Sequence, residues 1–251
     1  MPVTLLDDVA VGAAGVVAGA VNAIAGAGSL LTFPVLVGVG LSPLSANVTN
    51  SIGVVPGNLA GTWGFRRELT GQRRRLAGFA VPATLGSVLG GVLILILPSH
   101  SFALVAPVLV GAASLLTLAQ PLITSRIDQA RTRRNSRALA VAIFAVSVYG
   151  GYFGSGIGVL FIALLSIFVI DELSRLNAAK TVLQALANGI AGILFAFFGP
   201  VHWWLVLILA ASTSLGAPIG ARLSVHIPAR VLRPVIGVVG LGAAVYLGLR
   251  A

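Results

Sequence analysis

The sequence predicts an all-α polytopic membrane protein made of two inverted repeats, each of about five transmembrane segments. Three observations predict it: an apolar composition, eight long apolar blocks, and an internal repeat whose basic loops change sides. Of the 251 residues, 57% are hydrophobic and 9% charged, against about 45–50% and roughly 25% in soluble domains. With a mean hydropathy of +1.04, this composition excludes a soluble enzyme or a nucleic-acid-binding domain, although the net charge is +10.

The absence of cysteine and the composition of the first eight residues exclude further kinds of chemistry and processing. Cysteine is absent, which excludes disulfides, thiol catalysis and thiolate metal sites. Residues 1–8 contain no basic side chain and end in Asp7 and Asp8. The first apolar block is therefore expected to remain in the mature protein rather than to be cleaved as a signal peptide.

Eight apolar blocks follow one another along the chain, and two of them are too long for a single span. Six are close to the ~20 residues that cross a bilayer, whereas the first and fifth have 33 residues each. Glycine clusters at 26–29 and 154–158 interrupt these two, and because glycine tolerates positive φ, they predict helix breaks. The blocks are 9–41, 45–65, 76–97, 101–123, 138–170, 176–198, 203–225 and 230–249.

The second half of the chain repeats the first at an ungapped offset of 130 residues. Asparagine is scarce here, so the matches Asn47/Asn177 and Asn58/Asn188 are the most informative. The repeat predicts a first transmembrane repeat at 1–123, an arginine-rich linker at 124–137 and a second repeat at 138–251. Further matches are Gly26/Gly156, Gly28/Gly158, Leu85/Leu215, Gly86/Gly216, Gly90/Gly220 and Pro98/Pro228.

Arginine placement predicts that equivalent loops lie on opposite sides of the membrane. The loop 66–75 and the linker 124–137 are rich in arginine, so both are predicted to be cytoplasmic. The loop at 199–204, which is the repeat equivalent of the loop 66–75, has no Arg or Lys. Its residues His202, Trp203 and Trp204 are typical of an aromatic belt at the exterior interface. Conversely, the loop 98–101 lacks Arg and Lys, while the region around Pro228 carries three arginines, Arg222, Arg230 and Arg233.

Inversion requires an odd number of crossings per repeat. If blocks 9–41 and 138–170 are glycine-broken hairpins, each repeat has five segments and both termini lie outside the plasma (inner) membrane. Each hairpin arm is about 25 Å long, slightly short of a ~30 Å hydrocarbon core. The arms are therefore either short spans or re-entrant half-helices.

The glycine breaks are the first candidate binding elements. Half-helix N-termini at a break carry about +0.5 charge and free N–H groups, which can receive an anion. Ser29 is expected to cap the following half-helix and to offer its hydroxyl. The alternative interpretation is close helix packing through small residues. The candidate residues are Gly26, Gly28, Ser29, Gly156 and Gly158.

Polar side chains inside the second and sixth blocks form the other candidate set. Asn47 and Asn50 share one helical face, as do Asn177 and Lys180. A buried amide must be hydrogen-bonded, so these residues either contact substrate or join helices; Asn47 and Asn177 could also cap helix starts. The set is Asn47, Asn50, Asn58, Asn177, Lys180, Gln184 and Asn188.

Lys180 is the only lysine in the chain. A cation within a bilayer usually marks a pathway or a pair, so Lys180 either attracts an anion or extends its amine to the nearby interface. An alternative function is a membrane enzyme that acts on a lipid or peptide through a serine paired with Lys180. No carboxylate or metal-ligand cluster lies within a predicted span, so we expect no catalytic residues, metal or cofactor.

Several strings resemble the sulfite exporter TauE/SafE family, also called the 4-toluene sulfonate uptake permease family. The resemblance covers nearly the whole chain, although the family often has three consecutive glycines where this chain has Gly28-Ser29 and Gly158-Val159. The strings are GAVNAIAGAGSLLTFP at 19–34, ANVTNS at 46–51, PGNLAG at 56–61, YGGYFGSGIG at 149–158, NAAK at 177–180 and GAPIGARL at 216–223.

The resemblance implies a permease for small sulfur-containing anions, such as sulfite or organosulfonates, with export as the expected direction. Its partners would be this small anion and membrane lipids, to which the arginine loops are attracted, and no nucleic acid. The substrate, the coupling ion and the oligomeric state are left open at this point.

Overall fold

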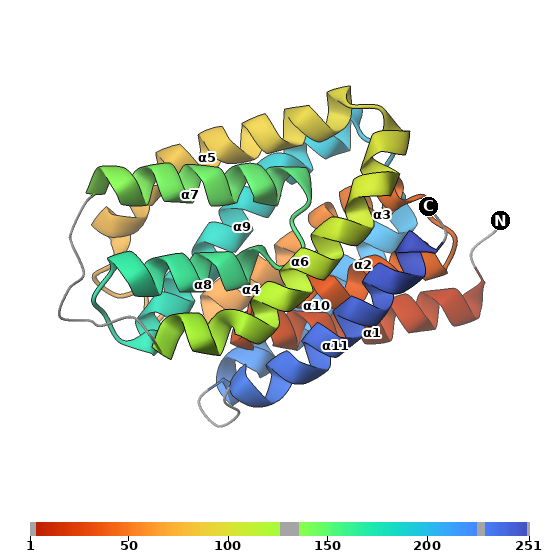
Figure 1. The fold of residues 1–251 in the computed structure, drawn as a ribbon. Helices are drawn as coiled ribbons and strands as arrows, with labels where there is room; N and C mark the ends of the chain where they lie inside the picture. The colour runs from red at the N-terminus through yellow and green to blue at the C-terminus, as the bar shows by residue number, and fades with distance from the viewer. Residues whose placement is uncertain (1–3, 126–135, 225–228, 250–251) are drawn as a thin grey trace.

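The chain is helical throughout the computed structural model, which describes residues 4–125, 136–224 and 229–249 (Figure 1). No strand occurs in these three ranges. Most of the predicted linker 124–137 lies outside them. The helices are α1 Leu5–Ile24, α2 Ser29–Gly38, α3 Pro43–Gly53, α4 Val55–Gly64, α5 Arg73–Ile96, α6 Ser99–Ser125, α7 Ser136–Tyr152, α8 Ile157–Phe168, α9 Leu173–Phe198, α10 Trp203–Leu223 and α11 Ala229–Gly248.

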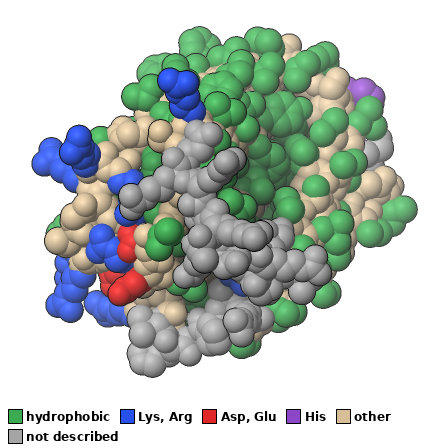
Figure 2. All heavy atoms as spheres, turned by 60° about the vertical axis from the view of Figure 1, so that its left-hand side comes forward, with side chains coloured by type: hydrophobic (Ala, Val, Ile, Leu, Met, Phe, Trp, Pro, Cys, Tyr) green, Lys and Arg blue, Asp and Glu red, His purple; other side chains and the backbone are tan. Residues whose placement is uncertain are grey.

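Six of these helices, α1, α5, α6, α9, α10 and α11, are long and apolar enough to cross a membrane. Apolar side chains cover much of the face seen in Figure 2, and charged side chains gather at one edge of it. Exposed apolar side chains of this density are stable against lipid and not against water. The prediction of an all-α polytopic membrane protein is confirmed at this level.

Both long apolar blocks break at their glycine clusters, as predicted. The first forms α1 and α2, and the fifth forms α7 and α8, which runs back beside α7 (Figure 1). Gly26 has a φ of +78°, and Gly154 and Gly156 each have a φ of +76°. Side chains rarely allow this left-handed conformation, so glycine lets the chain leave one helix and begin the next within four residues.

The second apolar block contains a break that the sequence analysis did not predict. Block 45–65 forms two helices, α3 and α4, joined at Val54. Pro56 has no N–H to donate to the carbonyl of Ile52, so the hydrogen-bond ladder is interrupted there. The position 130 residues later is Leu186, and α9 continues through it.

Polar contacts define two ends of the bundle. At one end, Arg75 Nη1 and Arg175 Nε bond the carboxylate of Asp171 at 2.7 and 2.9 Å, joining the starts of α5 and α9. At the other, the Trp204 indole donates to Asp8 at 3.1 Å, joining the starts of α10 and α1. We call the first the arginine end (Arg66, Arg67, Arg73, Arg74, Arg75, Arg175, Arg222) and the second the aromatic end (His202, Trp203, Trp204).

Helices from the two halves pack closely through small residues. On α1 and α10, Gly15 faces Ser212, and Gly216 faces the backbone of Val16. The pair α5 and α7 is built in the same way, with Gly151 against the backbone of Ser87. Such contacts let apolar helices approach where lipid offers no hydrophobic driving force between them.

Candidate functional site

The two glycine breaks, one from each half of the chain, touch each other. A Cβ built on Gly26 would lie 2.7 Å from the carbonyl carbon of Gly158, and one on Gly158 would lie 2.6 Å from Cα of Gly26. The two backbones are thus in direct contact, and only glycine fits on either side. Beside them, the Ser155 hydroxyl donates to the carbonyl of Ser29 at 3.4 Å.

The other break glycines serve local packing, which was the alternative interpretation. A Cβ on Gly28 would collide with the backbone of Ala18 in α1. Gly156 is the N-cap of α8, and a Cβ there would lie 3.0 Å from that of Ala113 in α6. The structure therefore divides the four matched glycines into two that form the contact between breaks and two that shape each break.

Asn47 and Asn177, the best-matched residues of the repeat, play the same role in both halves. The Asn47 amide donates to the carbonyl of Tyr152 at 3.1 Å, at the C-terminus of α7. The Asn177 amide donates to the carbonyl of Ala23 at 3.0 Å, at the C-terminus of α1. Each amide thus closes the open end of the broken helix from the opposite half.

The interpretation of these asparagines as caps of their own helices is wrong. Helix α3 begins with Ser42 as its N-cap, whose hydroxyl accepts from the N–H of Ser45, and α9 begins after Glu172. Asn47 and Asn177 lie inside their helices, about one turn from the start.

Lys180 is completely buried, which contradicts the interpretation that its amine extends to the interface. Its ammonium donates to the carbonyls of Asn22 and Ala23 at 3.0 and 3.2 Å. These carbonyls form the negative C-terminal end of α1, which carries about half an elementary charge. The lysine charge is therefore partly compensated by the helix dipole.

Asn50 and Ser29 also differ from expectation. Although Asn50 matches Lys180 in the repeat, it accepts a hydrogen bond from the Thr32 hydroxyl at 2.6 Å and so joins α3 to α2. Ser29 does not cap α2, because the N-cap is Gly28, which has no side chain to make a capping bond. Instead, the N–H of Gly28 donates to the Asn22 side chain at 2.8 Å.

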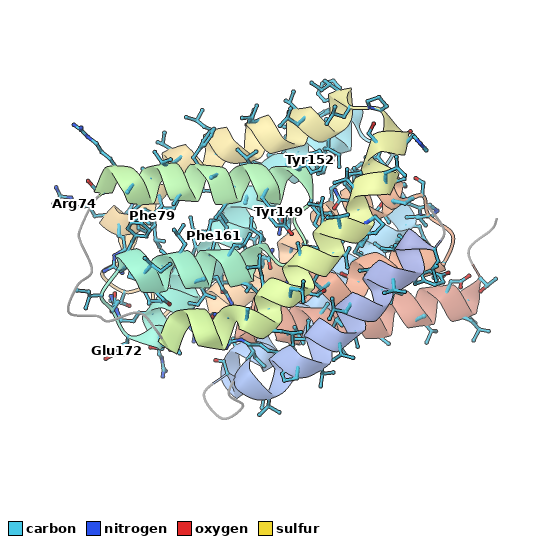
Figure 3. The ribbon with its side chains drawn as sticks, in the orientation of Figure 1. Arg74, Phe79, Tyr149, Tyr152, Phe161 and Glu172 are labelled. Carbon is cyan, nitrogen blue, oxygen red and sulfur yellow. The ribbon has the colours of Figure 1, made fainter. Side chains whose placement is uncertain are left out.

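Asn22 and Tyr149 belong to the breaks and were missed by the sequence analysis. Asn22 bonds across the first break, and the Tyr149 hydroxyl donates to the carbonyl of Ser155 at 2.8 Å across the second. Tyr149 and Tyr152 lie at the end of α7 that leads into the break (Figure 3). Their signal was present, since both Asn22 and Tyr149 precede a glycine cluster inside an apolar block.

Three further amides in the candidate set are buried without complete hydrogen bonding. Asn58, Gln184 and Asn188 are at most 2% exposed. Within the described part of the chain, Asn58 Nδ2, Gln184 Oε1 and both polar atoms of the Asn188 amide have no partner. Buried polar groups are normally satisfied, so such a group calls for a functional explanation.

Two of these three amides contact the breaks, and the third lies at the same level of the bundle. Gln184 contacts Gly158, where a Cβ would lie 2.6 Å from its carbonyl oxygen, and Asn188 Oδ1 would lie 3.2 Å from a Cβ on Gly154. On α4, Gly61 faces Thr181 and Val55 faces Gly189. Asn58 is midway between Val55 and Gly61, so it lies on the level of residues 184–185 of α9.

The helix ends at the contact are electrostatically unequal. Helices α2 and α8 begin at Ser29 and Ile157, and most of their first N–H groups donate to carbonyls three residues earlier. These N-termini still carry the positive charge of the helix dipole. The C-termini of α1 and α7 are occupied by side-chain donors, Asn177 and Lys180 on one and Asn47 on the other. Side-chain donors thus neutralise the two negative ends, whereas the N-cap residues of α2 and α8 make no side-chain capping bond. The remaining dipole charge favours an anion at this place.

Acidic residues in the described ranges lie at or between helix ends, and no group of three His, Asp or Glu side chains there could hold a metal. Asp128 lies outside the described residues. Lys180 Nζ bonds two carbonyls and no serine hydroxyl, so the serine–lysine pair of the alternative enzyme hypothesis has no geometric support.

A family model described as sulfite exporter TauE/SafE matches residues 11–247. The chain belongs to the TauE/SafE sulfite exporter family. It is therefore a membrane transporter and not an enzyme. No solved structure matches it.

Similar proteins carry transporter names without a named cargo. The probable membrane transporter protein YfcA of Escherichia coli (strain K12) is 28% identical over 226 residues, which cover 88% of this chain and 82% of that protein. The probable membrane transporter protein ORF9 of Sinorhizobium sp is 26% identical over 233 residues, 92% and 88% of the two chains. A probable membrane transporter protein of Haemophilus influenzae is 28% identical over 222 residues, 88% and 87%.

Proposed function

We propose that this transporter exports small sulfur-containing anions, sulfite or organosulfonates, through a site where the two glycine breaks meet. The observation that supports the proposal is that two helix N-termini, whose dipoles are positive, meet beside buried amides with unpartnered polar atoms. An oxyanion offers several acceptor atoms and a negative charge, which match amide donors and positive helix ends.

Within this site the amides nearest the breaks make the direct contacts. Asn58 and Asn188 have Nδ2 groups free to donate, and Gln184 lies against the break at Gly158. The other candidate residues support them by shaping the breaks or neutralising helix ends. This supporting set is Gly26, Gly28, Ser29, Asn47, Asn50, Gly156, Gly158, Asn177 and Lys180.

Alternating access would follow from an inverted arrangement of the two repeats, 1–123 and 138–251. In support, α5 starts at the arginine end, whereas its repeat equivalent α10 starts at the aromatic end. Asn47 and Asn177 also make reciprocal contacts between the halves. In this arrangement the arginine end faces the cytoplasm, by the positive-inside rule, and both termini lie outside the inner membrane.

The substrate class and direction rest on the family name and on charge. The family description names sulfite export. An inside-negative potential drives an anion outward by about 2.3 kcal/mol per charge for each 100 mV. Export therefore requires no carboxylate proton relay within the membrane.

A flux assay tests the proposal. Purified protein in liposomes is loaded with sulfite, taurine, 4-toluenesulfonate or sulfate, and efflux is measured at imposed potentials of either sign. We expect saturable flux of at least one sulfite or sulfonate substrate, faster when the potential expels anions. If none of these compounds moves at either polarity while the protein remains folded, the substrate assignment is wrong.

A further inference from the structure

A cavity lies at the arginine end, between the end of α4 and the last turn of α10. It has a volume of about 430 Å³, and its walls include Trp63, Arg66, Arg67 and Glu68 from the α4 side and Arg222 from α10. Its lining therefore carries three arginines and one glutamate. The cavity is the place where two lipid-facing helices reach the arginine end.

None of the three arginines of this cavity forms an ion pair with another residue that the structure describes. Both ion pairs found among the described residues are made by Asp171, and neither includes Arg66, Arg67 or Arg222. Arg66 is held in place by Trp63, because its guanidinium lies 5.2 Å from the indole centroid and donates to the Trp63 carbonyl at 3.3 Å. The cavity thus presents a net positive charge with one donor group fixed over an aromatic ring.

An apolar path leads along the helices to this cavity. Leu59 and Trp63 are 57% and 70% exposed on α4 and, being four residues apart, share one face. On α10, Leu215 is 67% exposed and Ile219 51% exposed, just before Arg222. Apolar side chains that end at a tryptophan and arginines match the profile of a phospholipid at the membrane interface.

The cavity is separate from the contact between the glycine breaks. Ala221 of the cavity wall belongs to a buried apolar cluster with Phe65, Ala178 and Ala23. This cluster separates the cavity from the end of α1, where the Ala23 carbonyl accepts from Asn177. A ligand in the cavity would therefore be held apart from the amides of the proposed transport site.

We propose that this cavity binds the phosphate of an anionic phospholipid, with its acyl chains along Leu59, Trp63, Leu215 and Ile219. Arg66, Arg67 and Arg222 contact the phosphodiester, and the bound lipid bridges α4 to α10. A free phosphate shares the headgroup chemistry but lacks the acyl chains, so only a lipid uses the apolar path.

Native mass spectrometry of the purified protein in detergent, titrated with phosphatidylglycerol, tests the proposal. The variant Arg66→Gln/Arg222→Gln is compared with Arg73→Gln/Arg74→Gln, which removes the same charge from exposed positions at the same end, outside the cavity. We expect at least a tenfold loss of phosphatidylglycerol affinity in the first variant and less than a twofold change in the second. If the double variant does not fold, the single variant Arg222→Gln replaces it in the comparison. We expect this variant to lose less phosphatidylglycerol affinity than the double variant, but more than the Arg73→Gln/Arg74→Gln control.

Three results would overturn the assignment. Equal losses in the two double variants would mean that the arginine end attracts lipid only by overall charge. Equal affinity of the parent for phosphatidylcholine would remove the anionic selectivity. Displacement of the lipid by millimolar inorganic phosphate or sulfite would identify the cavity as a site for free anions.

Discussion

Replacing Lys180 with glutamine tests how the transport site selects anions. Lys180 precedes Gln184 by one turn of α9 and Asn188 by two, which places the charge about 6–12 Å from them along the axis at ~1.5 Å per residue. At an effective dielectric constant of about 20, a unit charge at these distances contributes about 1.4–2.8 kcal/mol. The half charge at the C-terminus of α1 opposes it, so we expect about a tenfold loss of anion affinity.

The assay compares two ligands of similar shape, methanesulfonate and the neutral methanesulfonamide, by calorimetric titration of purified variants. Lys180→Gln should weaken methanesulfonate binding about tenfold and leave methanesulfonamide binding unchanged. Arg74→Gln is the control, because Arg74 extends away from the bundle at the arginine end (Figure 3), and it should bind both ligands as the parent does.

Two results would refute this reasoning. Unchanged methanesulfonate affinity in a folded Lys180→Gln variant would show that its charge plays no part in selection. Equal losses for both ligands would mean that the lysine acts only by holding the end of α1 through the carbonyls of Asn22 and Ala23.

Three further changes have distinct expected outcomes. Asn188→Leu removes an unpartnered buried amide and should abolish flux while leaving thermal stability equal or higher. Asn177→Leu removes an amide that donates a hydrogen bond, and it should lower the free energy of unfolding by about 1 kcal/mol. A loss of thermal stability in Asn188→Leu would contradict the first expectation. Gly26→Ala should destabilise by about 1–3 kcal/mol, because its φ is positive and the opposite backbone is in contact, whereas Gly78→Ala, with open space around it, should be neutral or stabilising in the same thermal unfolding measurement. Burial alone would raise the pKa of Asp171, but hydrogen bonds and the charges of its two arginine partners lower this pKa below 3.8. The ion pairs therefore stabilise the folded protein above pH 3.8, and this stabilisation is lost as the pH falls through the lowered pKa of Asp171. Because the pairs are partly exposed, the loss should be below about 1 kcal/mol, and it should disappear from a pH series of unfolding temperatures in Asp171→Asn.

Several features of the fold could be predicted because they depend on neighbouring residues alone. Apolar blocks locate helices in lipid, since each backbone polar group must bond within its own segment. Glycine clusters locate the breaks because positive φ is a property of one residue. The break at Val54 was missed although Pro56 was visible, because proline is tolerated inside α2, α5 and α10, and the sequence gives no rule for which prolines interrupt a helix.

The sequence predicted which residues belong to the candidate site but not which groups they form hydrogen bonds with. Asn47 and Asn177 were identified from the repeat, yet each donates to a carbonyl more than 100 residues away. Lys180 was identified as the only lysine, yet its acceptors are backbone atoms of α1, which carry no sequence signal. Asn22 and Tyr149 were missed because their role is defined by the shape of the break rather than by residue type.

The sequence by itself determined the membrane setting, the places where helices break and the set of polar residues inside the spans. These follow from hydropathy and backbone freedom, which act over one or a few turns. Only the tertiary structure decided that the two breaks touch, which helix ends are neutralised and which amides are left without partners. Those properties depend on atoms brought together from distant parts of the chain, and a hydrogen bond exists only when donor and acceptor meet within about 3 Å.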